Sequence, residues 1–197
     1  MKNNVPTIVR YIMLIIVVSS TMSCQNKEKQ KREAHLKSVI ENCLGKKLII
    51  PDSIRIYAPF HNNIADSVQL SNAQFKIYSH INASCPTCIR DILLWNNIIP
   101  DFEKLEVPII LICESDDNFE LFKYIIESGE IKNFSYPFFL DMKCDFFTKN
   151  NFMKKSSHFE TVLTGRENTI LLLGNPIRSK EMKDIYLNEI QKQKDSQ

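Results

Sequence analysis

The 197-residue sequence lacks an apolar run of about 20 residues, which is the length that a transmembrane helix needs. Its N-terminal apolar segment, Tyr11 to Val18, is much shorter, lies after the basic residues Lys2 and Arg10, and is followed by small residues. This pattern is typical of a secretory signal peptide. We therefore expect residues 1–23 to be a signal peptide and the remaining chain to be exported.

Without this segment the sequence also lacks a net charge. The full chain contains 25 Lys and Arg against 23 Asp and Glu, and two of the basic residues, Lys2 and Arg10, fall within residues 1–23. The remaining chain therefore has 23 charged residues of each sign. A nucleic-acid-binding face requires an excess of basic residues to neutralise phosphates, so we expect no nucleic-acid partner.

Internal repeats and a second metal-ligand motif are absent as well. With 44% hydrophobic and 24% charged residues, the chain suits one well-buried core rather than two. Its single Cys-x-x-Cys motif, Cys85-Pro86-Thr87-Cys88, is accompanied neither by another such pair nor by paired histidines. This composition argues against a structural zinc site.

The residues that lead up to Cys24 indicate how the exported chain is held. Thr21-Met22-Ser23-Cys24 resembles a bacterial lipobox, although Thr21 stands where leucine is usual. The resemblance implies that Cys24 receives a diacylglyceryl group and becomes the N-terminus. If the segment were instead kept as a short anchor, the domain would still be tied to a membrane surface.

The rest of the chain divides into three further parts. These are a polar tether at 24–35, an N-terminal helix and strand extension at 36–70, and a main domain at 71–197. In the extension, apolar residues at helical spacing from Leu36 to Leu44 predict a helix that Gly45 ends. Short strands are expected at 48–50 and 54–57, before a polar loop through Asn62, Asn63 and Asp66.

The main domain alternates strand-like and helix-like segments. Strands are expected at 75–81, 107–113, 136–140, 160–164 and 169–173. Helices are expected from Cys85, with Pro100 kinking or ending it, from the capping-box pair Asp117 and Glu120 to Gly129, and from about residue 181. This order predicts an α/β fold: a three-layer α/β/α sandwich with a parallel βαβ unit, then an antiparallel hairpin and a C-terminal helix.

The motif Cys85-Pro86-Thr87-Cys88 falls between a predicted strand and a predicted helix. At that junction Cys85 is expected at the helix N-cap, where unpaired backbone N–H groups and the helix dipole stabilise a thiolate. Pro86 suits the first helical position, and Cys88 lies one turn further in. Cys85 would then attack a substrate disulfide and Cys88 would resolve the mixed disulfide. A pair of metal ligands and an inert disulfide remain as alternatives.

With this motif in place, residues 75–193 resemble a thioredoxin-fold domain. The likeness is carried by Cys85-Pro86-Thr87-Cys88, by the hairpin from Thr161 to Leu173, and by Gly174-Asn175-Pro176 before the final helix. The chain is similar to membrane-anchored thioredoxin-like lipoproteins of Gram-negative envelopes. The resemblance implies a thiol–disulfide oxidoreductase that faces the periplasm, needs no cofactor, and uses Cys85 and Cys88 as its redox pair. Its partners would be envelope protein disulfides and an envelope electron donor.

The sequence departs from that family at three positions. Ser84 precedes the first cysteine where tryptophan is usual, and Ser79 stands where the family has a buried, proton-accepting aspartate. No proline occurs near Phe159 or Glu160, where the family's cis-proline would fall, so we expect trans peptide bonds there. Substrate handling is therefore expected to differ from that of ordinary thioredoxins.

His158, beside the missing proline, is the remaining candidate site residue. The resemblance places it across from Cys85, where an imidazole could transfer a proton near neutral pH. With Cys85 and Cys88 it could also form a copper site, since thiolates select Cu(I) and imidazole suits copper. An exposed loop histidine without a role is the simplest alternative. The competing hypothesis for function is thus a binding module, either copper-binding or redox-silent.

The other cysteines and His80 are not expected to act in the reaction. Cys113 lies in an apolar run and is expected in the core. Cys43 and Cys144 could pair in an oxidising compartment or remain idle, because sequence does not fix the connectivity. His80 is expected to pack or to form a hydrogen bond within the sheet.

Overall fold

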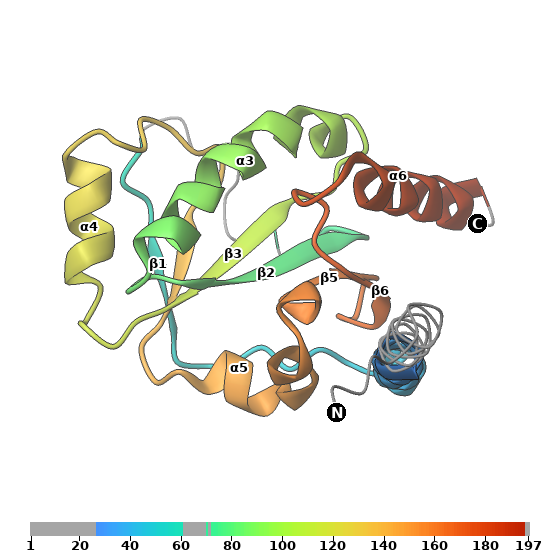
Figure 1. Cartoon of the computed structure of the whole chain (residues 1–197). Helices are drawn as coiled ribbons and strands as arrows, with labels where there is room; N and C mark the ends of the chain where they lie inside the picture. Colours follow the sequence, from blue (N-terminus) through green and yellow to red (C-terminus); the bar gives the residue numbers. More distant parts are fainter. Residues whose placement is uncertain (1–26, 61–69, 71, 196–197) are drawn as a thin grey trace, which may run out of the picture. The chain divides into compact units, whose positions relative to one another are not determined.

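The computed structural model describes residues 27–60, 70 and 72–195 (Figure 1). The predicted signal peptide 1–23, the lipidation site Cys24 and the polar loop through Asn62, Asn63 and Asp66 lie outside the described residues. The chain separates into two compact units, Met1–Asn42 and Cys43–Gln197, which are described one at a time.

The first unit is helical wherever it is described. The helix already includes residues 27–35, which are the described part of the polar tether expected at 24–35. Ion pairs one turn apart favour a helix there, between Lys29 and Glu33 at 3.9 Å and between Lys37 and Glu41 at 3.8 Å. Among the described helices, none has both the length and the apolar character required to cross a membrane.

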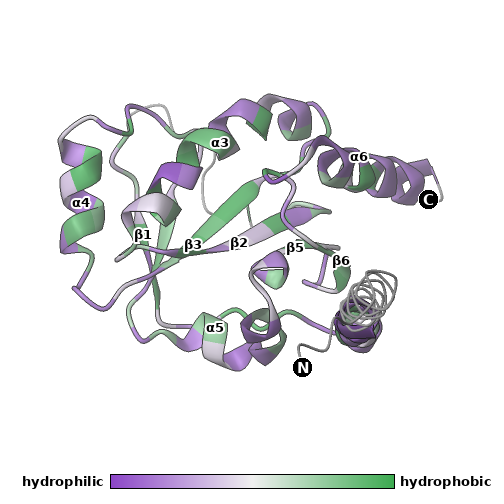
Figure 2. Ribbon diagram, in the orientation of Figure 1, coloured by the Kyte–Doolittle hydropathy of each residue, from purple (hydrophilic) through white to green (hydrophobic). Residues whose placement is uncertain are grey.

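The second unit is built on a six-stranded sheet in the order β1-β4-β3-β2-β5-β6. The pairs β2/β3 and β3/β4 are parallel, whereas β1/β4, β2/β5 and β5/β6 are antiparallel. The strands are β1 Ile54–Tyr57, β2 Lys76–Asn82, β3 Ile109–Glu114, β4 Phe138–Asp141, β5 Thr161–Thr164 and β6 Ile170–Leu173. The strand β3 is almost wholly hydrophobic (Figure 2), as expected for a strand buried on both faces.

Helices cover both faces of this sheet. They are α3 Pro86–Glu103, α4 Glu120–Glu127, α5 Asp145–Lys149 and α6 Lys180–Asp195, with the short 3₁₀ helices η1 Asn151–Lys155 and η2 Ser157–Phe159. Figure 1 shows α3 above the sheet and α5 below it. Phe147 of α5 stacks on His80 of β2 with ring centroids 4.4 Å apart, on the face opposite α3. The predicted three-layer α/β/α fold is confirmed, including its parallel β2-α3-β3 unit and the closing hairpin.

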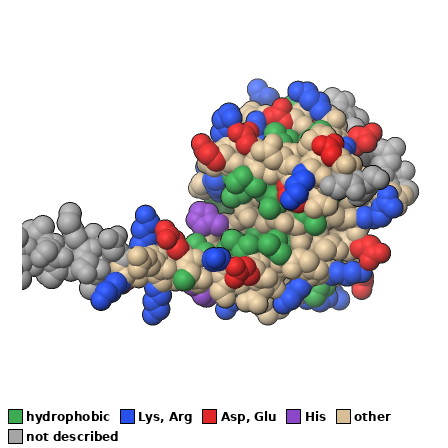
Figure 3. Space-filling view, turned by 90° about the vertical axis from the view of Figure 1, so that its right-hand side faces the viewer, with side chains coloured by type: hydrophobic (Ala, Val, Ile, Leu, Met, Phe, Trp, Pro, Cys, Tyr) green, Lys and Arg blue, Asp and Glu red, His purple; other side chains and the backbone are tan. Residues whose placement is uncertain are grey.

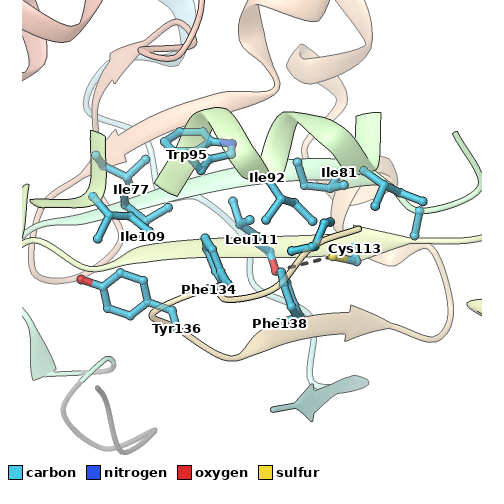
Figure 4. Close-up of a cluster of buried hydrophobic side chains, with 14 of the residues drawn as sticks. Ile77, Ile81, Ile92, Trp95, Ile109, Leu111, Cys113, Phe134, Tyr136 and Phe138 are labelled. Carbon is cyan, nitrogen blue, oxygen red and sulfur yellow. Dashed lines mark hydrogen bonds between the residues drawn. The ribbon is translucent and has the colours of Figure 1, made fainter. Parts of the chain in front are cut away.

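The packing of α3 on the two central strands forms the core. Ile92 and Trp95 of α3 lie against Ile77 of β2 and Leu111 of β3, and all four side chains have no exposed surface (Figure 4). Each such side chain contributes about 1.5–3 kcal/mol when fully buried. This contact fixes the axis of α3, and therefore the place where its N-terminus leaves the sheet.

One local expectation is wrong, and of the two outcomes expected at Pro100, a kink or an end of the helix, the end is excluded. Residues 48–50 form no strand, because the Asn150 side chain takes both hydrogen bonds of Ile49: Ile49 N donates to Oδ1 at 3.0 Å, and Nδ2 donates to Ile49 O at 2.8 Å. Pro100 does not end α3, which continues to Glu103. The strand expected at 54–57 is confirmed as β1, at the edge of the sheet beside β4.

The chain turns sharply at Gly174, between β6 and α6. Its φ is +141°, and a Cβ atom there would lie 2.7 Å from Met182 of α6. The Gly174 carbonyl also accepts a hydrogen bond from the buried hydroxyl of Tyr186 at 2.6 Å. A glycine at this position therefore allows α6 to dock on the hairpin.

We expect Gly174→Ala to lower the free energy of unfolding by about 1–3 kcal/mol, because an L-residue is strained at this φ. Urea unfolding followed by circular dichroism measures the change. Gly165→Ala is the matched control: a Cβ there meets nothing closer than 3.7 Å, so stability should stay within about 1 kcal/mol of the parent. Equal stability of the two variants would contradict the role given to Gly174.

Candidate active site at the N-terminus of α3

Cys85 occupies the N-cap of α3, as the sequence predicts. Its backbone is extended, with φ −112° and ψ 110°, and Pro86 follows at the first helical position. The Cys85 sulfur accepts a hydrogen bond from the backbone N–H of Cys88 at 3.3 Å. A sulfur that takes the place of a capping oxygen is best suited to this role as a thiolate, because the helix N-terminus favours negative charge.

The two thiols of the motif have opposite acidities. The pKa of Cys85 is lowered, chiefly by the hydrogen bond from the Cys88 side chain and then by the backbone N–H of Cys88. Burial raises the pKa of Cys88 to about 12, and the charges of Cys85, Asp91 and Glu160 add to that rise. Cys85 is therefore the more acidic of the two thiols, and Cys88 is a protonated donor beside it at neutral pH.

Ser84, the residue that replaces the usual tryptophan, ties the motif to the loop after β3. Its backbone N–H donates to Asn82 Oδ1 at 2.9 Å, and its hydroxyl oxygen accepts from the Asp116 N–H at 2.9 Å. The same hydroxyl lies 3.3 Å from Ser115 Oγ. These bonds hold the backbone before Cys85 against the carboxyl end of β3, so the nucleophile starts from a fixed position.

The loop after β3 is itself fixed by Asp117. One carboxylate oxygen accepts from the Phe119 N–H at 3.1 Å and the other from the Leu121 N–H at 3.0 Å. The hydroxyl of Ser115 also donates to this carboxylate, and these bonds, led by that of Ser115, lower the pKa of Asp117. The carboxylate therefore holds the start of α4, but the predicted capping box of Asp117 and Glu120 is not formed, because the N-cap of α4 is Phe119.

Ser79 stands where the thioredoxin resemblance implies a proton-accepting aspartate. Its hydroxyl pairs with the hydroxyl of Thr161. Ser79 Oγ lies 2.8 Å from Thr161 Oγ1 in a buried contact between β2 and β5. The carboxylates whose charges act on Cys88 are instead Asp91 of α3 and Glu160, the residue before β5. Sequence reasoning missed both. The three-residue spacing from Cys88 could have indicated Asp91, but no local pattern connects Glu160 to the motif.

His158 lies exposed in η2, and its backbone N–H donates to Ser156 Oγ at 3.2 Å. Within the described part of the chain, its imidazole forms no hydrogen bond with Cys85 or Cys88. Described peptide bonds are all trans, as expected for the loop from Ser157 to Glu160. A proton-transfer role for His158 stays a prediction.

A three-ligand copper site is not assembled in this structure. Over the residues that the structure describes, no three His, Cys, Asp or Glu side chains are grouped closely enough to hold a metal ion. Cys85, Cys88 and His158 are therefore not brought together as one ligand set.

The remaining cysteines and His80 occupy structural positions. Cys113 is fully buried in β3, as predicted, and burial raises its pKa. Cys43 and Cys144 are free thiols, as are Cys85 and Cys88. His80 forms a hydrogen bond at 3.2 Å to Glu114 in addition to its ring stacking, so both parts of its predicted packing are confirmed.

Comparison with known proteins finds similarity at the level of fold. No family model and no curated protein matches the chain. A thioredoxin-like protein from Bacteroides caccae shares 20% identity and a TM-score of 0.44, over 82% of this chain and 54% of that one. The thioredoxin domain of a thiol-disulfide oxidoreductase from Bacteroides vulgatus shares 14% identity and a TM-score of 0.43, over 72% of this chain and 96% of that one. An uncharacterized thioredoxin-like protein from Porphyromonas gingivalis shares 15% identity and a TM-score of 0.42, over 61% of this chain and 75% of that one. No residue role is transferred from them.

We expect alkylation by iodoacetamide at pH 7 to modify Cys85 before Cys88, because Cys85 has the larger thiolate fraction. Cys88→Ala should move the midpoint of the Cys85 rate–pH profile upward, since its thiol no longer donates to the Cys85 sulfur. Peptide mapping by mass spectrometry identifies the modified residue, and Cys144→Ala serves as the control with an unchanged midpoint. Faster modification of Cys88 than of Cys85 would contradict the assignment.

Proposed function

We propose that this protein is a thiol–disulfide oxidoreductase that acts on protein disulfides through Cys85 and Cys88. The observation that carries the proposal is the unequal pair of thiols at the N-terminus of α3. The pKa of Cys85 is lowered by hydrogen-bond donors to its sulfur, whereas burial raises the pKa of Cys88 and keeps that thiol protonated. Strongly perturbed pKa values of this kind are typical of functional sites.

The chemistry follows from that difference. The Cys85 thiolate attacks one sulfur of a substrate disulfide, the substrate S–S bond breaks, and a mixed disulfide and one substrate thiolate result. Cys88 then loses its proton and attacks the Cys85 sulfur, and the second substrate sulfur leaves as a thiolate. The substrate disulfide gains two electrons, and the Cys85–Cys88 pair becomes a disulfide.

The entrance to the pair suits a macromolecular substrate. Cys85 is partly exposed, and its neighbours Pro86 and Thr87 are exposed at the surface. The exposed residues around Cys85 would let a disulfide on a protein surface approach its sulfur. Figure 3 shows another face of the molecule, on which acidic and basic side chains are interspersed.

The proposed setting is the cell envelope. Residues 1–23 have the pattern of a signal peptide, and Cys24 follows a lipobox-like sequence, so the exported chain would be anchored to a membrane and face the periplasm. An oxidising compartment supplies disulfides as substrates. It also requires an envelope electron donor if the pair is to act repeatedly as a reductant.

Reduction of insulin disulfides by the full chain, with dithiothreitol as the electron source, tests the proposed activity. Cys85→Ser should reduce turnover to the level of the reaction without protein, because the nucleophile is lost, whereas Cys144→Ser should retain it. His158→Ala tests the proton-transfer prediction. We expect this change to lower the rate of insulin reduction without abolishing it. Absence of turnover in the parent protein, together with Cu(I) binding that needs Cys85, Cys88 and His158, would support the copper-binding alternative instead.

Labelling of expressing cells with radioactive palmitate tests the proposed anchor. The parent chain should carry label, and mass spectrometry should find a modified Cys24 at its N-terminus. Cys24→Ala should lose the label and keep residues 1–23, whereas Cys43→Ala should behave as the parent. Label on the Cys24→Ala protein would contradict lipidation at this residue.

A further inference from the structure

The second step of the proposed reaction needs a group that accepts the proton of Cys88. The pKa of this thiol, raised to about 12, leaves very little thiolate at neutral pH. The interior position Ser79 offers only a hydroxyl, which is already 2.8 Å from Thr161 Oγ1. The carboxylates whose charges act on Cys88 are those of Asp91 and Glu160, which makes them the candidates for a general base.

Asp91 is committed to an ion pair. Both of its carboxylate oxygens accept from the guanidinium of Arg178, with Oδ1 at 3.3 Å from Nη1 and Oδ2 at 2.5 Å from Nη2. A bidentate pair of this kind occupies both oxygens of the carboxylate, so neither is free to accept a proton from Cys88. Asp91 therefore contributes a fixed negative charge near Cys88 and fastens α3 to the turn before α6.

Unlike Asp91, Glu160 forms no ion pair with another described residue. Its backbone is fixed, because its carbonyl accepts from the His80 N–H at 2.8 Å and the next residue begins β5. Across the described residues its carboxylate has no hydrogen bond or ion pair, and the side chain is partly buried between buried Phe159 and Thr161. Burial raises the pKa of Glu160, which makes the carboxylate a better proton acceptor.

Charged groups from three elements surround the Glu160 carboxylate. His80 of β2 and Arg178 of the turn before α6 lower its pKa, and Asp91 of α3 raises it. His80 is itself held by Glu114 at 3.2 Å and by the ring of Phe147. His80 and Arg178 therefore oppose the effect of burial on the pKa of Glu160, and among the described residues its carboxylate has no hydrogen-bond partner.

We infer that Glu160 is the general base that takes the proton of Cys88 when Cys88 resolves the mixed disulfide. The inference rests on the proposed oxidoreductase function. The Cys88 S–H bond breaks as its proton passes to the Glu160 carboxylate, and the Cys88 sulfur bonds to that of Cys85. The bond between Cys85 and the substrate breaks, and the departing thiolate takes up the proton from Glu160. No further oxidant or reductant is needed in this step.

Stopped-flow measurement on the full chain, with a chromogenic aromatic disulfide such as dithiobis(nitrobenzoate), separates the two steps. Release of the first thiol reports the attack by Cys85, and release of the second reports resolution by Cys88. Glu160→Gln should leave the first release within about twofold of the parent, and should slow the second about 100-fold at pH 7. In Glu160→Gln, the pH profile of the second-step rate should also lose the inflection that the carboxyl group causes. The rate should then rise only with the hydroxide concentration.

Asp91→Asn is the matched control, since it removes a negative charge near Cys88 but keeps Glu160. It should resolve the mixed disulfide at least as fast as the parent, because the pKa of Cys88 falls. Glu160→Asp, which keeps a carboxylate, should recover part of the rate. The rate of Cys85 alkylation and the circular dichroism spectrum confirm that each variant is folded with an intact thiol pair.

Two results separate failure of the inference from failure of the proposed function. A normal first release, with a second release equally fast in Glu160→Gln and the parent, would overturn the role of Glu160 alone. The same holds if Asp91→Asn slows the second step as much as Glu160→Gln does. No first release in the parent would overturn the oxidoreductase function, and the inference with it.

Discussion

The structure of the site depends on one hydrogen bond that caps α3. In it, the backbone N–H of Cys88 donates to the Cys85 sulfur at 3.3 Å. This cap exists because β2 ends at Asn82 and α3 begins at Pro86, which leaves three residues to turn the chain. The turn is held in place by Ser84, which joins it to the loop after β3, and by the burial of Trp95 against the central strands. The acidity of Cys85 is therefore a consequence of how the whole α3 helix packs.

The same packing divides the two thiols into different environments. A residue at the N-cap faces solvent and unpaired N–H groups, whereas a residue one turn later faces the sheet. Cys85 and Cys88 thus acquire opposite acidities, and the hydrogen bond between their sulfurs adds to the difference. Two nearby carboxylates add to this difference: Asp91 is paired with Arg178, whereas Glu160 is partly buried and has no hydrogen-bond partner among the described residues.

The parts of this structure that could be predicted from sequence are those that local patterns determine. The alternation at 75–81, the apolar run at 107–113 and the Cys-Pro junction give β2, β3 and the start of α3. The errors arise from distant contacts. Residues 48–50 fail to form a strand because Asn150, far along the chain, satisfies the backbone of Ile49. Glu160 reaches the site only because β5 pairs with β2, which places it beside His80.

The departures at Ser79 and Glu160 are best understood together. A carboxylate inside the sheet at residue 79 would lie between buried strands and would need a partner to remain charged. A hydroxyl at that position instead pairs with Thr161 and costs little to bury. The carboxylate of Glu160, just before β5, is only partly buried, and His80 and Arg178 lower its pKa against the effect of burial. Moving the acid from the strand interior to the end of a neighbouring strand therefore keeps a base near Cys88 while leaving the centre of the sheet free of charge.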